Sequence, residues 1–177
     1  MEKFIDIHYF TAPVGELILG SYEEQLCLCD WRYRKMRAAI DKRTQQALKA
    51  GYKEGSSAVI IKTIQQLNEY FDGKRTFFDI PLLLIGTDFQ KRVWNLLLSI
   101  PYGNTISYLK LSEQIGNPLA IRSVASANGA NSISIIIPCH RIIGSNRELV
   151  GYAGGLDAKK KLLALESPSS CTQTLLF

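Results

Sequence analysis

The sequence has few of the residues that tie a fold together covalently or through a metal. Its 177 residues include four cysteines and only two histidines, His8 and His140, and no two cysteines are separated by two residues. A chain of this length can bury a core without disulfides, and structural zinc sites draw on closely spaced Cys and His pairs. We therefore expect reduced thiols, no bound metal and an intracellular, cytoplasmic protein.

Long apolar runs are also missing. The longest uncharged stretch, residues 123–139, is interrupted by Ser, Asn and Gly, whereas a membrane-spanning helix needs about 20 predominantly apolar residues. The first ten residues, MEKFIDIHYF, lack the basic stub and apolar core of a secretory signal. The sequence therefore predicts no association with a membrane.

Basic residues outnumber acidic ones clearly only in the second half of the chain. Residues 1–80 carry 12 basic and 11 acidic side chains, whereas residues 81–177 carry 9 and 5. Such an excess favours a polyanionic partner, but it is small enough to fit an ordinary solvated surface equally well. Charge alone does not decide the function.

The hydrophobic pattern of the first half predicts a small mixed domain. Alternating apolar residues predict three strands, over 4–11, 16–22 and 25–31. A helical period begins at Ser57 and stops near Gly73, and the segment TFFDIP predicts a further strand that ends at Pro81. Strands give way to closely spaced helices after residue 85, so we expect an α+β protein with two domains, residues 1–85 and 86–177.

The second half opens with three expected helices. Thr87 and Gln90 form a capping box for a helix that stops before Pro101. Two short helices follow, over 107–115 and about 119–128, in the pattern of a helix-turn-helix. The second of these carries one Arg among small residues, so its backbone could approach a DNA groove closely. A close contact between two helices would use small residues too, and the pattern leaves both interpretations open.

The chemistry is concentrated after the helices. The apolar run ISIIIP predicts a buried strand that delivers Cys139, His140 and Arg141 at its end, where Pro138 stops the ladder. A thiol becomes a nucleophile beside positive charge or a base. Adjacent residues of an extended chain point to opposite sides, so His140 would reach the thiol through a turn or a bridging water, with Glu166 available to orient its ring. An inert buried cysteine is the alternative.

The last hundred residues resemble the O6-alkylguanine-DNA alkyltransferase family in the order and spacing of their motifs. The matching segments are YGNTISY at 102–108, IRSVASAN at 121–128, Asn131, IPCHRII at 137–143, GYAGG at 151–155 and KKLLALE, which ends at Glu166. The first half resembles the variable N-terminal domain of that family more loosely, through its strand meander and NEYFDGKR. The resemblance implies a small RNase H-like α/β domain followed by a helical domain with a winged helix-turn-helix.

The resemblance also implies a role for individual residues. Cys139 would take the alkyl group from O6 of guanine, His140 would relay a proton through water, and Glu166 would orient His140. Asn131 would brace the turn before the active site, and Tyr108 would contact the flipped base. Arg122 would enter the duplex from the minor groove, and the implied DNA contacts are Arg122, Ser123, Ala125, Asn128 and Tyr108. Tyr152, Ala153 and Ile142 would line the base pocket.

The expected function is therefore DNA repair in a single turnover by a monomer. The partner would be double-stranded DNA with O6-alkylguanine, and no cofactor would be needed. Ser132 stands where the family usually has Pro, and Ala153 leaves the pocket loop without a hydroxyl. Two other functions remain open: a Cys/His hydrolase, which would turn over repeatedly, and a helix-turn-helix DNA-binding protein, which would keep its DNA binding without Cys139.

Overall fold

The computed structural model describes residues 3–167, and Cys171 lies outside them. The chain forms two compact units and passes from one to the other between Gly86 and Thr87. Within residues 3–167, no helix is both long enough and apolar enough to cross a membrane.

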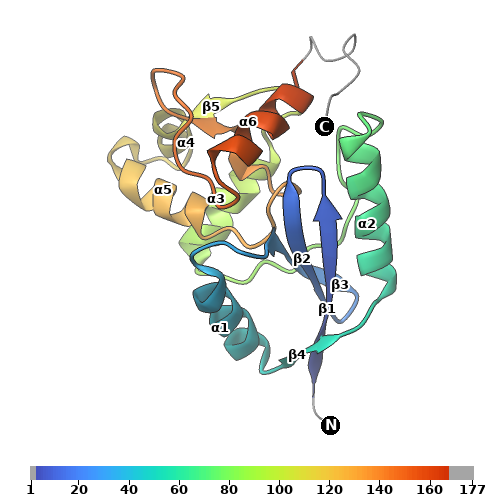
Figure 1. The fold of residues 1–177 in the computed structure, drawn as a ribbon. Helices are drawn as coiled ribbons and strands as arrows, with labels where there is room; N and C mark the ends of the chain where they lie inside the picture. The colour runs from blue at the N-terminus through green and yellow to red at the C-terminus, as the bar shows by residue number, and fades with distance from the viewer. Residues whose placement is uncertain (1–2, 168–177) are drawn as a thin grey trace. The chain divides into compact units, whose positions relative to one another are not determined.

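The first unit is built on a four-stranded sheet with the order β3-β2-β1-β4, whose long strands are blue in Figure 1. The strands are β1 (Phe4–Ala12), β2 (Gly15–Tyr22), β3 (Gln25–Trp31) and β4 (Gly51–Glu54). Neighbours among β1, β2 and β3 are antiparallel, and β4 runs parallel to β1. The predicted meander of three strands is confirmed, and β4 is an addition that the sequence did not indicate.

Two helices accompany this sheet, α1 (Arg37–Leu48) and α2 (Ala58–Phe71). Helix α2 was predicted: the Ser57 hydroxyl accepts a hydrogen bond from the Ile60 N–H, and Gly73 follows the helix with φ +70°. Helix α1 was not predicted, because it buries little more than Ile40 and Thr44 and shows no apolar period.

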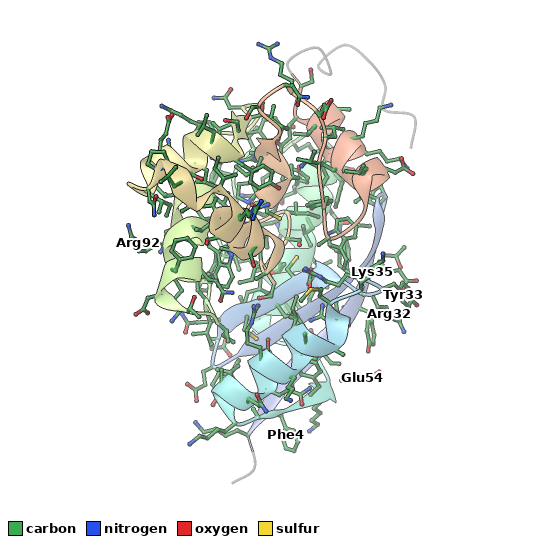
Figure 2. All side chains as sticks on the ribbon, turned by 90° about the vertical axis from the view of Figure 1, so that its left-hand side faces the viewer. Phe4, Arg32, Tyr33, Lys35, Glu54 and Arg92 are labelled. Carbon is green, nitrogen blue, oxygen red and sulfur yellow. The ribbon has the colours of Figure 1, made fainter. Side chains whose placement is uncertain are left out.

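Helix α1 lacks an apolar face and is held in place by ionic contacts instead. Asp30, fully buried at the end of β3, accepts hydrogen bonds from Arg34 at 2.9 Å and from Arg37 at 2.8 Å. Arg37 also pairs with Asp41 one turn along α1. By contrast, Arg32 and Tyr33 stand on the surface beside this network (Figure 2), with the Arg32 guanidinium 5.2 Å from the Tyr33 ring centre.

The strand predicted for TFFDIP is wrong. Residues 76–81 have no strand structure, and the segment meets β3 only at an isolated bridge between Leu26 and Leu82. The side-chain amide of Gln66 on α2 binds the backbone of Asp79, accepting from its N–H at 2.9 Å. Pro81 has no N–H and cannot donate to a neighbouring strand. The Asp79 N–H, which a strand would pair with its neighbour, is bound by the Gln66 side chain instead.

The second unit is mainly helical, with one small parallel sheet. Its elements are α3 (Asp88–Leu98), β5 (Ile106–Ser107), α4 (Tyr108–Gln114), the 3-10 turn η1 (Pro118–Ala120), α5 (Ile121–Gly129), the 3-10 turn η2 (Cys139–Arg141), β6 (Ile142–Ile143) and α6 (Leu156–Leu165). The capping box of Thr87 and Gln90 is present at the start of α3. The Trp94 indole N–H donates to the Ala127 carbonyl at 2.8 Å and ties α3 to α5. The two predicted short helices are α4 and α5.

Candidate active site

The segment between α5 and Cys139 is a tight turn built around Asn131. This buried side chain donates from Nδ2 to the carbonyls of Ile133 at 3.4 Å and Ile137 at 3.0 Å, and its Oδ1 accepts from the Ile133 N–H at 2.9 Å. The Ile137 N–H also donates to the Ile133 carbonyl at 2.9 Å. A single amide side chain thus braces both ends of the turn.

The buried strand predicted for ISIIIP is therefore wrong. The segment is buried throughout, but Ile135 has φ +72°, a left-handed conformation that β-branched residues rarely adopt. Ser134 and Ile137 form only an isolated bridge. An apolar run indicates burial without specifying the backbone path, and here Asn131 satisfies backbone groups that a neighbouring strand would otherwise bind. Ser132, in place of the usual Pro, is itself buried in this turn.

Cys139 opens the 3-10 turn η2 rather than ending a strand. Its N–H donates to the Ile137 carbonyl at 2.8 Å, and its side chain is buried. His140 and Arg141 complete the same turn and are also buried. Successive side chains of a 3-10 turn point about 120° apart, so Cys139 and His140 are not on opposite sides of the chain as two strand residues would be.

Glu166, the residue after α6, joins His140 and Arg141. One carboxylate oxygen, Oε1, lies 2.8 Å from His140 Nε2 and 2.9 Å from Arg141 Nη2, and the other, Oε2, accepts from Arg141 Nε at 2.8 Å. Arg141 Nη1 also donates to the Ile100 carbonyl at 2.6 Å. Gly103 (φ +78°) passes close by, and a Cβ there would lie 2.8 Å from the Glu166 carbonyl oxygen. The close approach of this turn to the end of α6 therefore requires glycine.

These contacts fix the protonation of the pair. Burial by itself would raise the pKa of Glu166, but hydrogen bonds from His140 and Arg141 outweigh it and hold the pKa at about 2. Burial lowers the pKa of His140 despite the carboxylate beside it. The ring is therefore neutral near pH 7, with its proton on Nε2 facing Glu166. Its Nδ1 is buried and has no hydrogen-bond partner among residues 3–167, so it remains available as a proton acceptor.

Tyr108 and Lys159 interact electrostatically with the Cys139 thiolate, and Asn128 binds Tyr108. The Asn128 Nδ2 donates to the Tyr108 hydroxyl at 3.4 Å, and burial raises the pKa of Tyr108, with a further increase from a thiolate at Cys139. Burial lowers the pKa of Lys159, and the same thiolate raises it. Both groups are therefore within electrostatic range of the sulfur.

Comparison with known proteins shows which family the chain matches. The family model described as "6-O-methylguanine DNA methyltransferase, DNA binding domain" matches residues 88–168, and the ribonuclease-like domain of the same family matches residues 6–84. The chain belongs to the 6-O-methylguanine DNA methyltransferase family. Membership confirms the expected α+β fold with a ribonuclease-like first part and a DNA-binding second part.

Several members of the 6-O-methylguanine DNA methyltransferase family are similar along nearly their whole length. A methylated-DNA–protein-cysteine methyltransferase of Mycolicibacterium paratuberculosis is 50% identical over 95% of this chain and 98% of its own. The crystal structure of Mycobacterium tuberculosis OGT in complex with DNA matches with a TM-score of 0.77 and 39% identity, over 96% of this chain and 98% of that one. A Methanococcus jannaschii family member shares the fold with a TM-score of 0.62 at 22% identity, over 96% of each chain.

The residues of α5 that we expect to contact DNA differ in their exposure. Arg122 and Ser123 are exposed and Ala125 is half-buried, whereas Asn128 is buried beside Tyr108. The Oδ1 of Asn128 has no hydrogen-bond partner among the described residues. Asn128 therefore lies inside the fold against Tyr108 rather than on the exposed surface of α5.

The residues expected to line the base pocket are also separated. The Tyr152 ring lies edge-on to His140, with 6.3 Å between ring centres. Ala153 is half-buried in the same loop. Ile142 is fully buried in β6, where it pairs with Ile106. The loop that carries Tyr152 thus lies beside His140, whereas Ile142 is part of the hydrophobic core.

Sequence reasoning missed Lys159, although it is fully buried. Its ammonium donates to the carbonyls of Ile142 at 2.6 Å, Val150 at 2.9 Å and Gly151 at 3.5 Å. Lys159 thereby joins β6 to the loop that carries Tyr152. Burial lowers the pKa of Lys159 to about 8. The signal was available, because Lys159 shares a helical stripe with Leu162 and Glu166 on the buried side of α6.

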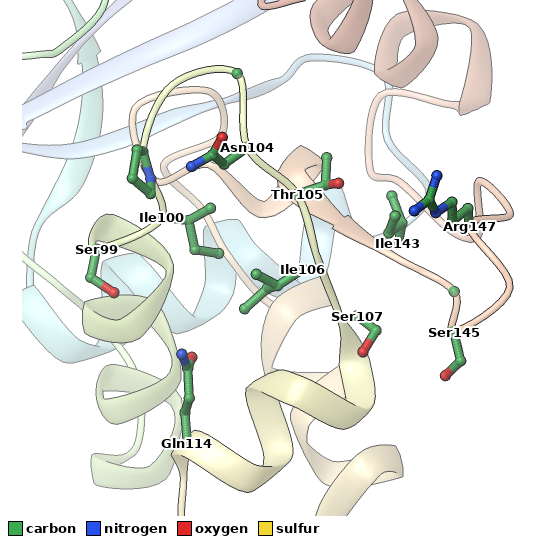
Figure 3. A pocket seen from close by; sticks show the side chains of 13 residues that line it. Ser99, Ile100, Asn104, Thr105, Ile106, Ser107, Gln114, Ile143, Ser145 and Arg147 are labelled. Atoms are coloured by element: carbon green, nitrogen blue, oxygen red, sulfur yellow. The ribbon is translucent and has the colours of Figure 1, made fainter.

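A pocket of about 690 Å³ lies close to β5 and β6 without including the thiol (Figure 3). Its lining comes from the end of α3 and the turn after it, from β5 and Gln114, and from residues 143–147. Ser107 and Ser145 belong to this lining, but Cys139, His140 and Tyr108 do not. The pocket is therefore separate from the cysteine site.

Proposed function

We propose that this protein repairs O6-alkylguanine in double-stranded DNA by moving the alkyl group irreversibly to its own Cys139. The observation that carries the proposal is the buried cluster of His140, Arg141 and Glu166, which adjoins a cysteine within the DNA-binding domain of this family. A regulator with an inert cysteine would not need a neutral imidazole held in this way beside the thiol. A Cys/His hydrolase could use the same groups, but it would turn over repeatedly, and the match to the DNA-binding domain of this family favours alkyl transfer.

The proton of the thiol moves to His140. Because Nε2 holds its proton against Glu166, Nδ1 accepts the proton of Cys139 through a bridging water. The imidazolium formed is stabilised by the Glu166 carboxylate, which Arg141 keeps ionised and in place. Asn131 holds the turn that presents the sulfur, and Lys159 adds positive charge within electrostatic range of it.

The alkyl group then moves in one displacement. The Cys139 Sγ donates an electron pair to the alkyl carbon, the bond from that carbon to O6 breaks, and its electron pair passes into the purine. The Tyr108 hydroxyl, which lies within electrostatic range of the sulfur, donates its proton to the purine anion, so guanine leaves in its normal neutral form. The proton that His140 took from the thiol then returns to the tyrosinate through water. The protein keeps a thioether, and neither a cofactor nor a metal takes part.

The reacting carbon is inaccessible inside stacked DNA. The damaged nucleotide must therefore leave the stack, at a cost of a few kcal/mol that an inserted side chain can offset. We assign the insertion to Arg122, which is exposed on α5, and the pocket for the extruded base to the loop of Tyr152 and Ala153.

The remaining assignments follow from this activity. Residues 86–177 form the domain that binds DNA and accepts the alkyl group, and residues 1–85 form a separate domain. The protein acts as a monomer, because all the proposed catalytic groups come from one chain. Its substrate is double-stranded DNA that contains O6-alkylguanine, and its location is the cytoplasm.

The test is the mass of the protein after incubation with duplex DNA that contains O6-methylguanine. We expect one added methyl group, located on Cys139 by peptide mapping, and a reaction that stops at one equivalent. The Cys139→Ser variant should gain no mass and should bind undamaged DNA within about 1 kcal/mol of the wild type, because phosphate and groove contacts lie elsewhere. Turnover beyond one equivalent, or transfer in the Cys139→Ser variant, would refute the proposal.

A further inference from the structure

Leu119 is the most exposed large apolar side chain among residues 3–167, with 94% of its surface accessible. It lies in the turn η1, between Pro118 and the first residues of α5. The Asn117 side chain accepts the Leu119 N–H at 3.1 Å, and Pro118 has a restricted φ. The backbone beneath this leucine is therefore held in a defined conformation.

The position of Leu119 relates it to Arg122. The turn η1 leads directly into α5, and residues three apart on a helical path lie on the same side. Ile121, immediately before Arg122, is also 39% exposed. The start of α5 thus presents two aliphatic side chains beside the arginine that we assign to insertion into DNA.

Charge is scarce over the same region. Arg122 is the only charged residue between Gln114 and Cys139. Attraction between lysine or arginine and the phosphates supplies most of the affinity in ordinary DNA binding and makes it depend strongly on salt. The segment of residues 115–138 supplies only one cation of its own, so contacts of another kind have to add to the affinity of this segment for the duplex.

We propose that Leu119 packs against the deoxyribose wall of the minor groove next to the base step that Arg122 enters. The proposal rests on the function proposed above, because it takes that face of α5 as the DNA-binding face. Proteins that bind the minor groove bring aliphatic side chains such as leucine into it, where they insert between base steps. The C–H groups of the deoxyribose walls offer an apolar surface to a leucine that lies beside such a step. Leu119 then adds affinity that does not depend on salt, because no counterion is released when apolar surfaces meet.

The test compares Leu119→Ala with Ile61→Ala in the full-length chain. Ile61 is a matched control, since it is an aliphatic side chain with 61% exposure on α2 in the other unit. Binding to an undamaged duplex is measured over a series of NaCl concentrations. We expect Leu119→Ala to weaken binding by about 3- to 10-fold at every concentration, with the slope against log salt unchanged, from the partial loss of leucine burial. Ile61→Ala should bind as the wild type does.

Two results would overturn the inference. One is an unchanged dissociation constant in Leu119→Ala, or a loss that Ile61→Ala reproduces. The other is tighter binding by Leu119→Lys, with a salt slope about one unit steeper, which would place the side chain against phosphates. Neither result depends on chemistry, because the duplex is undamaged. The proposed alkyl transfer is checked separately, by the reaction of each variant with free O6-benzylguanine, which should match the wild type.

Discussion

Arg141 binds both oxygens of Glu166, with Nε 2.8 Å from Oε2 and Nη2 2.9 Å from Oε1. The carboxylate that orients His140 is therefore oriented in turn by the residue that follows His140 in the chain. These contacts join the turn η2, which carries Cys139, to the end of α6. They provide a fixed negative charge beside the imidazole without leaving that charge unpaired in a buried site.

Removing the carboxylate should slow alkyl transfer. In Glu166→Gln, the side chain keeps its shape, but it no longer offsets the charge of a protonated His140. We expect the rate with free O6-benzylguanine to fall by about 10- to 1,000-fold, the usual range for a general acid–base contribution. Rapid-quench labelling of folded protein, with folding checked by circular dichroism, gives the rate. A rate equal to that of the wild type would show that the proton does not pass through His140.

Removing the guanidinium should mainly affect stability. Arg141→Met leaves the buried Glu166 with His140 as its remaining side-chain partner among the contacts described above, and breaking a buried ion pair typically costs about 3–5 kcal/mol. Urea denaturation measures the free energy of unfolding. Lys160→Ala is the control, because Lys160 is exposed on α6 and a surface change of this kind is usually within about 0.5 kcal/mol. Equal effects of the two substitutions would mean that the contact with Glu166 adds nothing to stability.

Loss of Arg122 should separate duplex substrate from free base. Arg122→Ala removes the side chain that we propose replaces the extruded guanine, so repair of double-stranded DNA should slow by roughly 10- to 1,000-fold, given an unstacking cost of a few kcal/mol. Free O6-benzylguanine, which is in no stack, should react at nearly the wild-type rate. If Arg122 only neutralised a phosphate, binding to all DNA would weaken uniformly and the salt slope would fall by about one. Equal slowing on both substrates would argue against insertion.

Acid should destabilise the protein in two steps. Burial lowers the pKa of His140 from the ordinary histidine value of 6.5, so below about that pH the unfolded chain binds a proton that the folded chain does not, and the free energy of unfolding falls. The pKa of Glu166 falls from an ordinary value of 4.5 to about 2 on folding, so its contribution is present above 4.5 and is lost as the pH falls towards 2. Urea unfolding at pH 7.5, 6.0 and 5.0 tests the first step. His140→Gln should show a shallower decline, and an identical decline in both proteins would exclude His140 as its source.

The sequence by itself determined the elements whose reasons are local. Alternating apolar residues specified β1, β2 and β3. The helical period from Ser57 and the capping box of Thr87 placed the starts of α2 and α3. The order of the motifs around Cys139 was also enough to indicate the family, because side-chain identity at fixed spacing needs no knowledge of the backbone path.

Only the tertiary structure decided the features that depend on side chains binding distant backbone or charge. Residues 132–138 form a turn rather than a strand because Asn131 supplies their hydrogen bonds, and α1 exists without an apolar period because Asp30 holds Arg37. Lys159 lies on a helical stripe that the sequence shows, but only the folded chain brings together the three carbonyl groups that bind its ammonium. Hydrophobic periodicity records which residues avoid water, but it carries no record of which polar groups will meet after folding. These hydrogen bonds and ion pairs decided the geometry of the site.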